Sequence, residues 1–129
     1  GVVITMPLVE IECVAAEGSP GPAASAAQCL ADALGAVFDS PPGRTWVRLR
    51  RLPAADYAEN HSPTLADDAL PVFVTVLHSQ LPEGAAMVEQ LVRITAAVAD
   101  VLACPLQRVH VQYAPAAAGR QAFGGTLVR

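Results

Sequence analysis

The sequence has few charged side chains and no lysine, and both features exclude classes of protein. Charged residues make up 16% of the 129 residues, and all eight positively charged residues are arginines. With 12 acidic residues the formal net charge is −4. No segment gathers enough arginines to form a basic surface for nucleic acid, so we expect no nucleic-acid partner.

Long uninterrupted hydrophobic runs are also missing, although 53% of the residues are hydrophobic. The longest apolar stretches are broken by Asp32, Arg93 and Asp100, whereas a membrane-spanning helix needs about 20 apolar residues. The first residues lack the basic and apolar regions of a signal peptide. We therefore expect a cytoplasmic protein without a membrane partner, whose apolar surface is buried between subunits.

The cysteines and histidines form no pattern typical of a metal site. Cys13, Cys29 and Cys104 include no C-x-x-C pair, and the three histidines lie apart from them. Free thiols of a reduced protein are the expected state, and a zinc site is not expected. The sequence also contains no phosphate-binding loop and no serine-histidine-aspartate set, so it implies no cofactor.

The first half of the chain predicts a strand, a helix and a second strand. Alternating polar and apolar residues from Pro7 to Val14 are typical of a strand. Ser19 is a suitable N-cap with Pro20 at the first helical position, and apolar residues then recur at helical spacing as far as Phe38. After a Ser-Pro-Pro-Gly stop, residues 45–52 alternate again and predict the second strand.

The second half predicts the same three elements in the same order. Residues 71–77 form a strand pattern, and Pro82 opens a helix. This helix has the clearest amphipathic stripe of the chain, formed by Met87, Leu91, Ile94, Val98 and Val101. Residues 109–113 predict a fourth strand, and the opening prolines, Pro7 and Pro71, are 64 positions apart. The chain therefore contains one β-α-β unit twice in tandem.

We predict a single domain over residues 1–129, with pseudo-repeats at 7–57 and 71–125 and an extension at 1–6. Residues 53–69 form a polar, proline-broken connector that predicts a loop or a β-hairpin. Two β-α-β units side by side give an α/β chain of the two-layer α+β sandwich type, with a four-stranded sheet and two helices on one face. We expect the opposite sheet face to be apolar and buried in a ring of subunits.

Several short motifs, in this order, are similar to those of the tautomerase superfamily. Met6 and Pro7 open a strand that reads Pro-Leu-Val-Glu-Ile, and Pro53-x-x-x-Tyr57 matches a proline-x-x-x-aromatic step. The segment 120–126 matches an aromatic-plus-Gly-Gly hairpin. The chain thus resembles 4-oxalocrotonate tautomerase-like proteins with two β-α-β units per chain. The resemblance implies a homotrimer with active sites at subunit interfaces and an isomerase that needs no cofactor.

The resemblance assigns Pro7 as an amino-terminal catalytic base. An ordinary α-amino group has a pKa of about 7.7–8.0, and burial lowers this pKa because it disfavours the cation. Such an amine can move a proton between carbon and oxygen next to a carbonyl. The role requires Met6 to be the initiator and to be removed, because a retained extension would make the Pro7 nitrogen an amide without basicity. The alternative is that Pro7 is a structural residue at the start of a strand.

The expected substrate is a small carboxylate, held by arginines and packed against aromatic rings. The candidate substrate-binding residues are Trp46, Arg48, Arg50, Tyr57, Arg120 and Phe123. Aligning the flanking prolines places Trp46, and not Arg48, where the family has its substrate-binding arginine. The alternatives are that the arginines are solvated surface charges and that the aromatic residues belong to the core.

At two positions where related proteins have an arginine, this sequence has none, and this affects which reaction we expect. Glu17 follows the first strand and His78 follows the third, where related proteins place arginines. We therefore expect a keto-enol tautomerase acting on a small 2-oxo or 2-hydroxy-alkenoate acid. A decarboxylase or hydratase of the same fold is the first alternative. A non-catalytic oligomeric binding protein is the second, and it applies if Pro7 is not amino-terminal.

Overall fold

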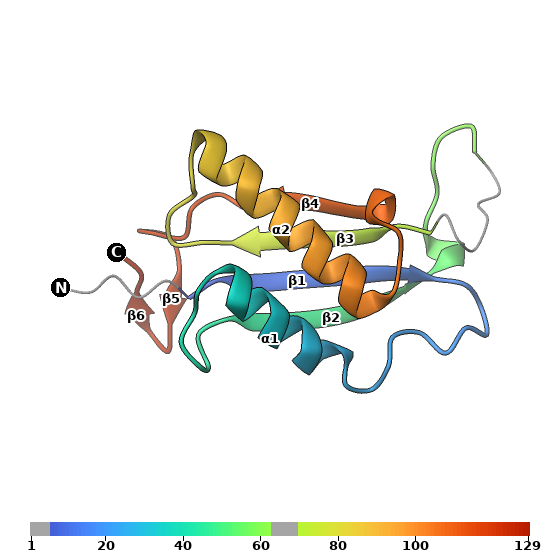
Figure 1. The fold of residues 1–129 in the computed structure, drawn as a ribbon, viewed down its shortest axis with the longest axis horizontal. Helices are drawn as coiled ribbons and strands as arrows, with labels where there is room; N and C mark the ends of the chain where they lie inside the picture. The colour runs from blue at the N-terminus through green and yellow to red at the C-terminus, as the bar shows by residue number, and fades with distance from the viewer. Residues whose placement is uncertain (1–5, 63–69) are drawn as a thin grey trace.

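Residues 6–62 and 70–129 of a computed structural model are described, and they form two layers. The sheet has the strand order β2-β1-β3-β4, with β1 at Leu8–Ala15, β2 at Trp46–Pro53, β3 at Val72–Leu77 and β4 at Val109–Tyr113. Helices α1 (Ala26–Val37) and α2 (Gly84–Leu102) both lie on one face of this sheet (Figure 1). The predicted fold class is confirmed. Residues 1–5 of the expected extension 1–6 and the connector positions 63–69 lie outside the described residues.

The strand pairing follows from two crossover connections. β1 and β2 are parallel and joined through α1, and β3 and β4 are parallel and joined through α2. The two units meet along β1 and β3, which pair antiparallel in the middle of the sheet. The start of β1 therefore lies at the same end of the sheet as the ends of β3 and β4, as Figure 1 shows.

The core lies between the sheet and the two helices. Alternate strand residues point toward the helices, as the period of two requires. The fully buried side chains of this core are Val9, Ile11, Leu30, Leu34, Val74, Val76, Ile94 and Val98. These include apolar positions from both expected helices.

The opposite face of the sheet is polar, so the expectation of an apolar face was wrong. Glu10 and Glu12 of β1 lie next to Arg48 and Arg50 of β2 on this face. On β3 and β4 it carries Phe73, Thr75, His110 and Gln112. Charged and amide side chains alternate with the core residues because each strand exposes every second residue to this face.

The first helix begins later than expected, at Ala26 with Ser25 as its N-cap, and not at Pro20. Gly21 has a φ of +68°, and it precedes a proline, which disfavours helical backbone at Gly21. The Ser19 hydroxyl instead accepts a hydrogen bond from the Gly21 N–H at 3.2 Å. Ser19 therefore stabilises a turn of the loop before the helix.

The C-terminal segment forms the expected hairpin. β5 (Ala122–Phe123) and β6 (Thr126–Leu127) pair antiparallel around a two-residue turn. Gly124 and Gly125 have φ values of +56° and +86°, which is the backbone that a type I′ turn requires. After β2 the connector contains the 3-10 helix η1 (Ala54–Asp56) and a single bridge between Glu59 and Ser62. Within the described residues, no helix is both long and apolar enough to cross a membrane.

Candidate functional site

Pro7 lies at the start of β1 in the middle of the sheet. Its side chain is fully buried, and its carbonyl accepts a hydrogen bond from the Trp46 N–H at 3.0 Å. Continuing the β1–β3 register by one residue places Pro7 opposite His78. In this sequence, the Pro7 nitrogen is bonded to Met6.

Arg44 supplies a cation at this end of the sheet, although no sequence motif pointed to it. Its Nη1 donates a hydrogen bond to the Met6 Sδ at 3.4 Å, and its side chain is exposed. The parallel register pairs Leu8 with Trp46, so two residues earlier Met6 lies beside Arg44. This proximity of Arg44 to Met6 depends on the pairing register of β1 and β2, which the sequence alone does not give.

Two aromatic rings border the same end of the sheet. Trp46, the first residue of β2, meets Phe123 edge to face, with ring centroids 5.0 Å apart. The C-terminal hairpin thus places the ring of Phe123 against that of Trp46, which lies beside Pro7. The Trp46 side chain keeps 42% of its surface exposed. Of the predicted candidates, the structure brings Pro7, Trp46 and Phe123 together.

A partly buried hydrogen-bond network, centred on the buried His78, lies opposite Pro7. His78 Nε2 is 3.0 Å from Gln90 Oε1, and the Tyr113 hydroxyl donates to the same oxygen at 2.7 Å. Because Gln90 Oε1 can only accept, Nε2 of His78 carries a proton and its Nδ1 is an acceptor when the ring is neutral. The ring meets Phe38 edge to face at 5.0 Å. Burial lowers the pKa of His78, although the hydrogen bond that its Nε2–H donates to Gln90 partly opposes this.

Ser79 adds an unused polar group next to His78. Its side chain is buried, and its hydroxyl has no hydrogen-bond partner among residues 6–62 and 70–129. Buried hydroxyls are normally paired. The hydroxyl is therefore available to a ligand at this end of the sheet.

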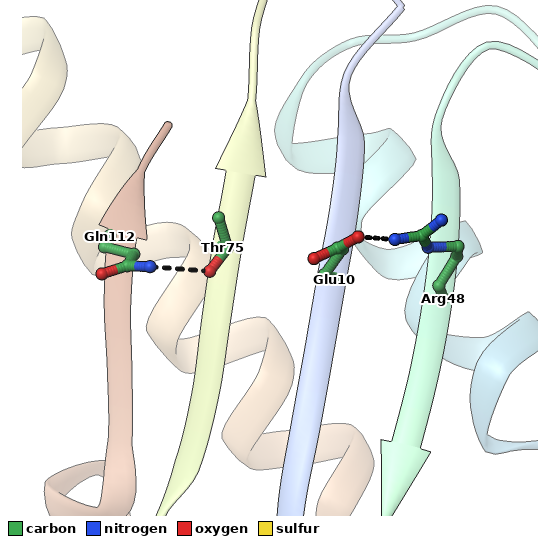
Figure 2. Close-up of polar contacts among 4 residues, drawn as sticks. All are labelled: Glu10, Arg48, Thr75 and Gln112. Carbon is green, nitrogen blue, oxygen red and sulfur yellow. Dashed lines mark hydrogen bonds and ion pairs between the residues drawn. The ribbon is translucent and has the colours of Figure 1, made fainter. Parts of the chain in front are cut away.

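Arg48 and Arg50 lie farther along β2, on the polar face of the sheet. Arg48 forms an ion pair with Glu10, and Gln112 donates a hydrogen bond to the Thr75 hydroxyl at 3.0 Å, as Figure 2 shows. Arg50 lines a cavity of about 430 Å³ on this face. Within one chain these two arginines are therefore grouped with the acidic side chains of β1, and not with Pro7.

The two remaining candidates lie apart from each other. Tyr57 follows η1 at the opposite end of the sheet, where its hydroxyl donates to Glu59 at 2.6 Å and its ring is 5.9 Å from Phe73. Arg120 is exposed on the turn before the hairpin, and its N–H donates to the Ala117 carbonyl at 2.8 Å. One chain therefore does not bring Tyr57 to Pro7. In the part of the chain that the structure describes, no three His, Cys, Asp or Glu side chains are grouped to hold a metal ion.

Comparison with known proteins identifies the fold. No protein-family model and no curated protein matches the sequence. Among solved structures, macrophage migration inhibitory factor from Oncomelania hupensis is similar with a TM-score of 0.70 at 18% identity, over 96% of this chain and 83% of that one. A wild-type fused 4-OT, a symmetric trimer, gives 0.69 at 17% identity over 94% of each chain.

A third similar structure is that of Pt0534 inactivated by 2-oxo-3-pentynoate. It gives a TM-score of 0.67 at 16% identity, and the match covers 93% of this chain and 95% of that one. The order of strands and helices and the position of Pro7 at the start of β1 agree with the expected resemblance. The chain therefore has the fold of the tautomerase superfamily.

Proposed function

We propose that the chain is a cofactor-independent keto-enol tautomerase whose base is the amine of Pro7, exposed by removal of the preceding residues. The substrate is a small 2-oxo or 2-hydroxy-alkenoate acid. One observation carries the proposal: a buried proline begins the central strand at the sheet end that also holds a cation, an aromatic pair and a partly buried polar network.

The surroundings of Pro7 suit an amine that is neutral near physiological pH. Burial disfavours the ammonium form and so lowers the pKa of an amine below its ordinary value. The free amine can accept the hydroxyl proton of a 2-hydroxy-alkenoate and return a proton to carbon, which forms the 2-oxo acid. The step is an isomerisation with no net transfer of electrons, so it needs no redox cofactor.

Arg44 is the proposed carboxylate-binding residue, with Arg120 as a second candidate from the turn before the hairpin. A guanidinium can donate two parallel hydrogen bonds to a carboxylate. Trp46 and Phe123 would contact the hydrocarbon part of the substrate. The hydroxyl of Ser79 and the network of His78 would contact the oxygen that changes between hydroxyl and carbonyl.

We also propose that the chain self-associates as a homotrimer. The fused 4-OT of similar fold is a symmetric trimer, and a high apolar content of 53% favours burial between subunits. In such an assembly Arg48, Arg50 and Tyr57, which lie away from Pro7 in one chain, would serve the site of a neighbouring subunit.

Two forms of the protein test the proposal, one beginning at Pro7 and one that retains Met6. We expect only the first to convert the enol of a 2-oxo monocarboxylic acid, followed by the loss of enol absorbance. Pro7→Ala in the first form should lower the rate by at least about 100-fold, since positioned proton transfer contributes about 10²–10⁴-fold. Equal rates in the two forms would overturn the proline mechanism.

The Met6–Pro7 peptide bond favours a second candidate function. If the native protein keeps this bond, the Pro7 nitrogen has no basicity, and the same site would bind a small carboxylate without converting it. Intact mass of the untagged protein made from its native gene separates the two functions. The mass of a chain that begins at Pro7 supports the tautomerase, and the mass of a chain that includes Met6 supports the binding protein.

A further inference from the structure

A second cavity lies at the carboxyl end of β1, at the opposite end of the sheet from Pro7. It has a volume of about 250 Å³ and lies between the loop after β1, the end of α2 and the 3-10 helix η3 (Leu106–Arg108). Its apolar lining includes Val14, Ala15, Pro22, Val72 and Leu102. Because drug-sized ligands need about 300–1,000 Å³, this cavity fits a smaller molecule.

Arg108 places an unused hydrogen-bond donor in the wall of this cavity. Its Nε is buried and has no hydrogen-bond partner among the described residues, and none of their carboxylates forms an ion pair with it. Buried polar groups normally have a hydrogen-bond partner, so we expect a ligand atom to accept a hydrogen bond from this Nε–H. The Nε and one Nη of a guanidinium can together bind both oxygens of a carboxylate.

The other residues in and around the cavity also suit an anion. Arg51 donates hydrogen bonds to the carbonyls of Ala16 at 3.0 Å and Ser19 at 2.6 Å, which fixes the loop and adds positive charge behind it. Two thiols, those of Cys13 and Cys104, also line the cavity. Burial raises the pKa of Cys13 to about 11 and also raises that of Cys104, so both thiols stay neutral and do not repel an anion.

We propose that this cavity binds a small aliphatic monocarboxylate. The carboxylate pairs with Arg108 at the wall, and the hydrocarbon chain lies against Val72 and Leu102. The site is separate from that of Pro7, so neither its presence nor its absence bears on the proposed tautomerase.

Titration of the full chain with butyrate and with its uncharged analogue butyramide tests the proposal. In ¹H–¹⁵N NMR spectra, we expect butyrate to shift the Gly21 amide and the Arg108 Nε–H signals saturably. Butyramide should bind about tenfold more weakly, and Arg108→Gln should weaken butyrate binding by about tenfold, because a charge-assisted pair is lost. The matched control Arg129→Gln, exposed at the C-terminus, should bind butyrate as the wild type does.

Equal binding of butyrate and butyramide, or unchanged binding in Arg108→Gln, would overturn the proposal. A second measurement applies if Arg108→Gln does not fold. In Cys29→Ser protein with Arg108 intact, saturating butyrate should slow iodoacetamide alkylation of Cys104 about tenfold, as expected for a site that is about 90% occupied. Butyramide at the same concentration, binding about tenfold more weakly, should slow the alkylation only about twofold. An alkylation rate that butyrate does not change would also overturn the proposal.

Discussion

The imidazole of His78 is buried at the sheet end that holds Pro7, and it takes part in the hydrogen-bond network there. It packs against Phe38 and shares the carbonyl oxygen of Gln90 with the Tyr113 hydroxyl. A neutral ring in this place adds no positive charge of its own to the proposed site. The charge that would bind a substrate carboxylate there has to come from arginines.

The stability of the protein should fall in acid because of His78. Burial holds the pKa of this residue below its ordinary value of 6.5. The unfolded chain therefore takes up the proton first, and the free energy of unfolding decreases as the pH falls through about 6.5 until the lower folded pKa is reached. His78→Gln should remove this pH dependence and cost about 1 kcal/mol at neutral pH through the lost hydrogen bond. Urea unfolding at several pH values measures both effects.

The exposed His110 provides the matched control for this experiment. His110→Gln changes the same residue type on the polar sheet face, so it should leave the acid-dependent loss of stability in place. If His78→Gln retains the slope that the wild type shows, another group causes it and the account of His78 is wrong.

At the scale of elements, the strands and the second helix could be predicted because their patterns are local. Residues 109–113 alternate and form β4 as expected. The start of α1 could not be predicted from Ser19 and Pro20 alone, because Gly21 takes a positive φ before a second proline. The boundaries of the pseudo-repeats, 7–57 and 71–125, stay a prediction.

The candidate site was harder to predict, because it depends on register between distant strands. Arg48 and Arg50 share a face with Trp46, as the alternation indicated, but Arg48 pairs with Glu10. Arg44 reaches Met6 only because of how β1 and β2 align. The polar sheet face, by contrast, does not depend on register, because the alternation within each strand already indicates it.

The C-terminal hairpin should control the environment of Trp46, the single tryptophan of the chain. Gly125 has a φ of +86°, and an alanine there costs about 1–2 kcal/mol. Gly125→Ala should therefore loosen the hairpin, move Phe123 away from Trp46 and shift the tryptophan emission to longer wavelength. Fluorescence spectra of the folded protein measure this shift.

Gly18→Ala is the control, because Gly18 has a similar φ of +78° in the loop after β1, with open space around it. It should cost similar stability without changing the tryptophan emission. Equal red shifts in the two variants would mean that the emission does not report on the hairpin.

At the scale of the whole molecule, the proposed homotrimer predicts the mass of the particle in solution. Sedimentation equilibrium should give three times the chain mass of 13.4 kDa at micromolar concentrations. Burial of apolar surface between subunits is the physical reason. A species of 13.4 kDa at every concentration would show that Arg48, Arg50 and Tyr57 cannot contribute to a neighbouring subunit's site.

Covalent labelling tests most directly whether the Pro7 nitrogen is the reactive amine. The acetylenic ketone 2-oxo-3-pentynoate inactivates Pt0534, a protein of similar fold. A free secondary amine would add to the conjugated triple bond, forming a nitrogen–carbon bond, with the amine proton ending on carbon. In Cys29→Ser protein that begins at Pro7, which lacks the exposed thiol, we predict one adduct per chain, located at Pro7 by peptide mass analysis and absent when Met6 is retained. An adduct elsewhere, or no adduct on the free amine, would contradict the assignment of Pro7 as the base.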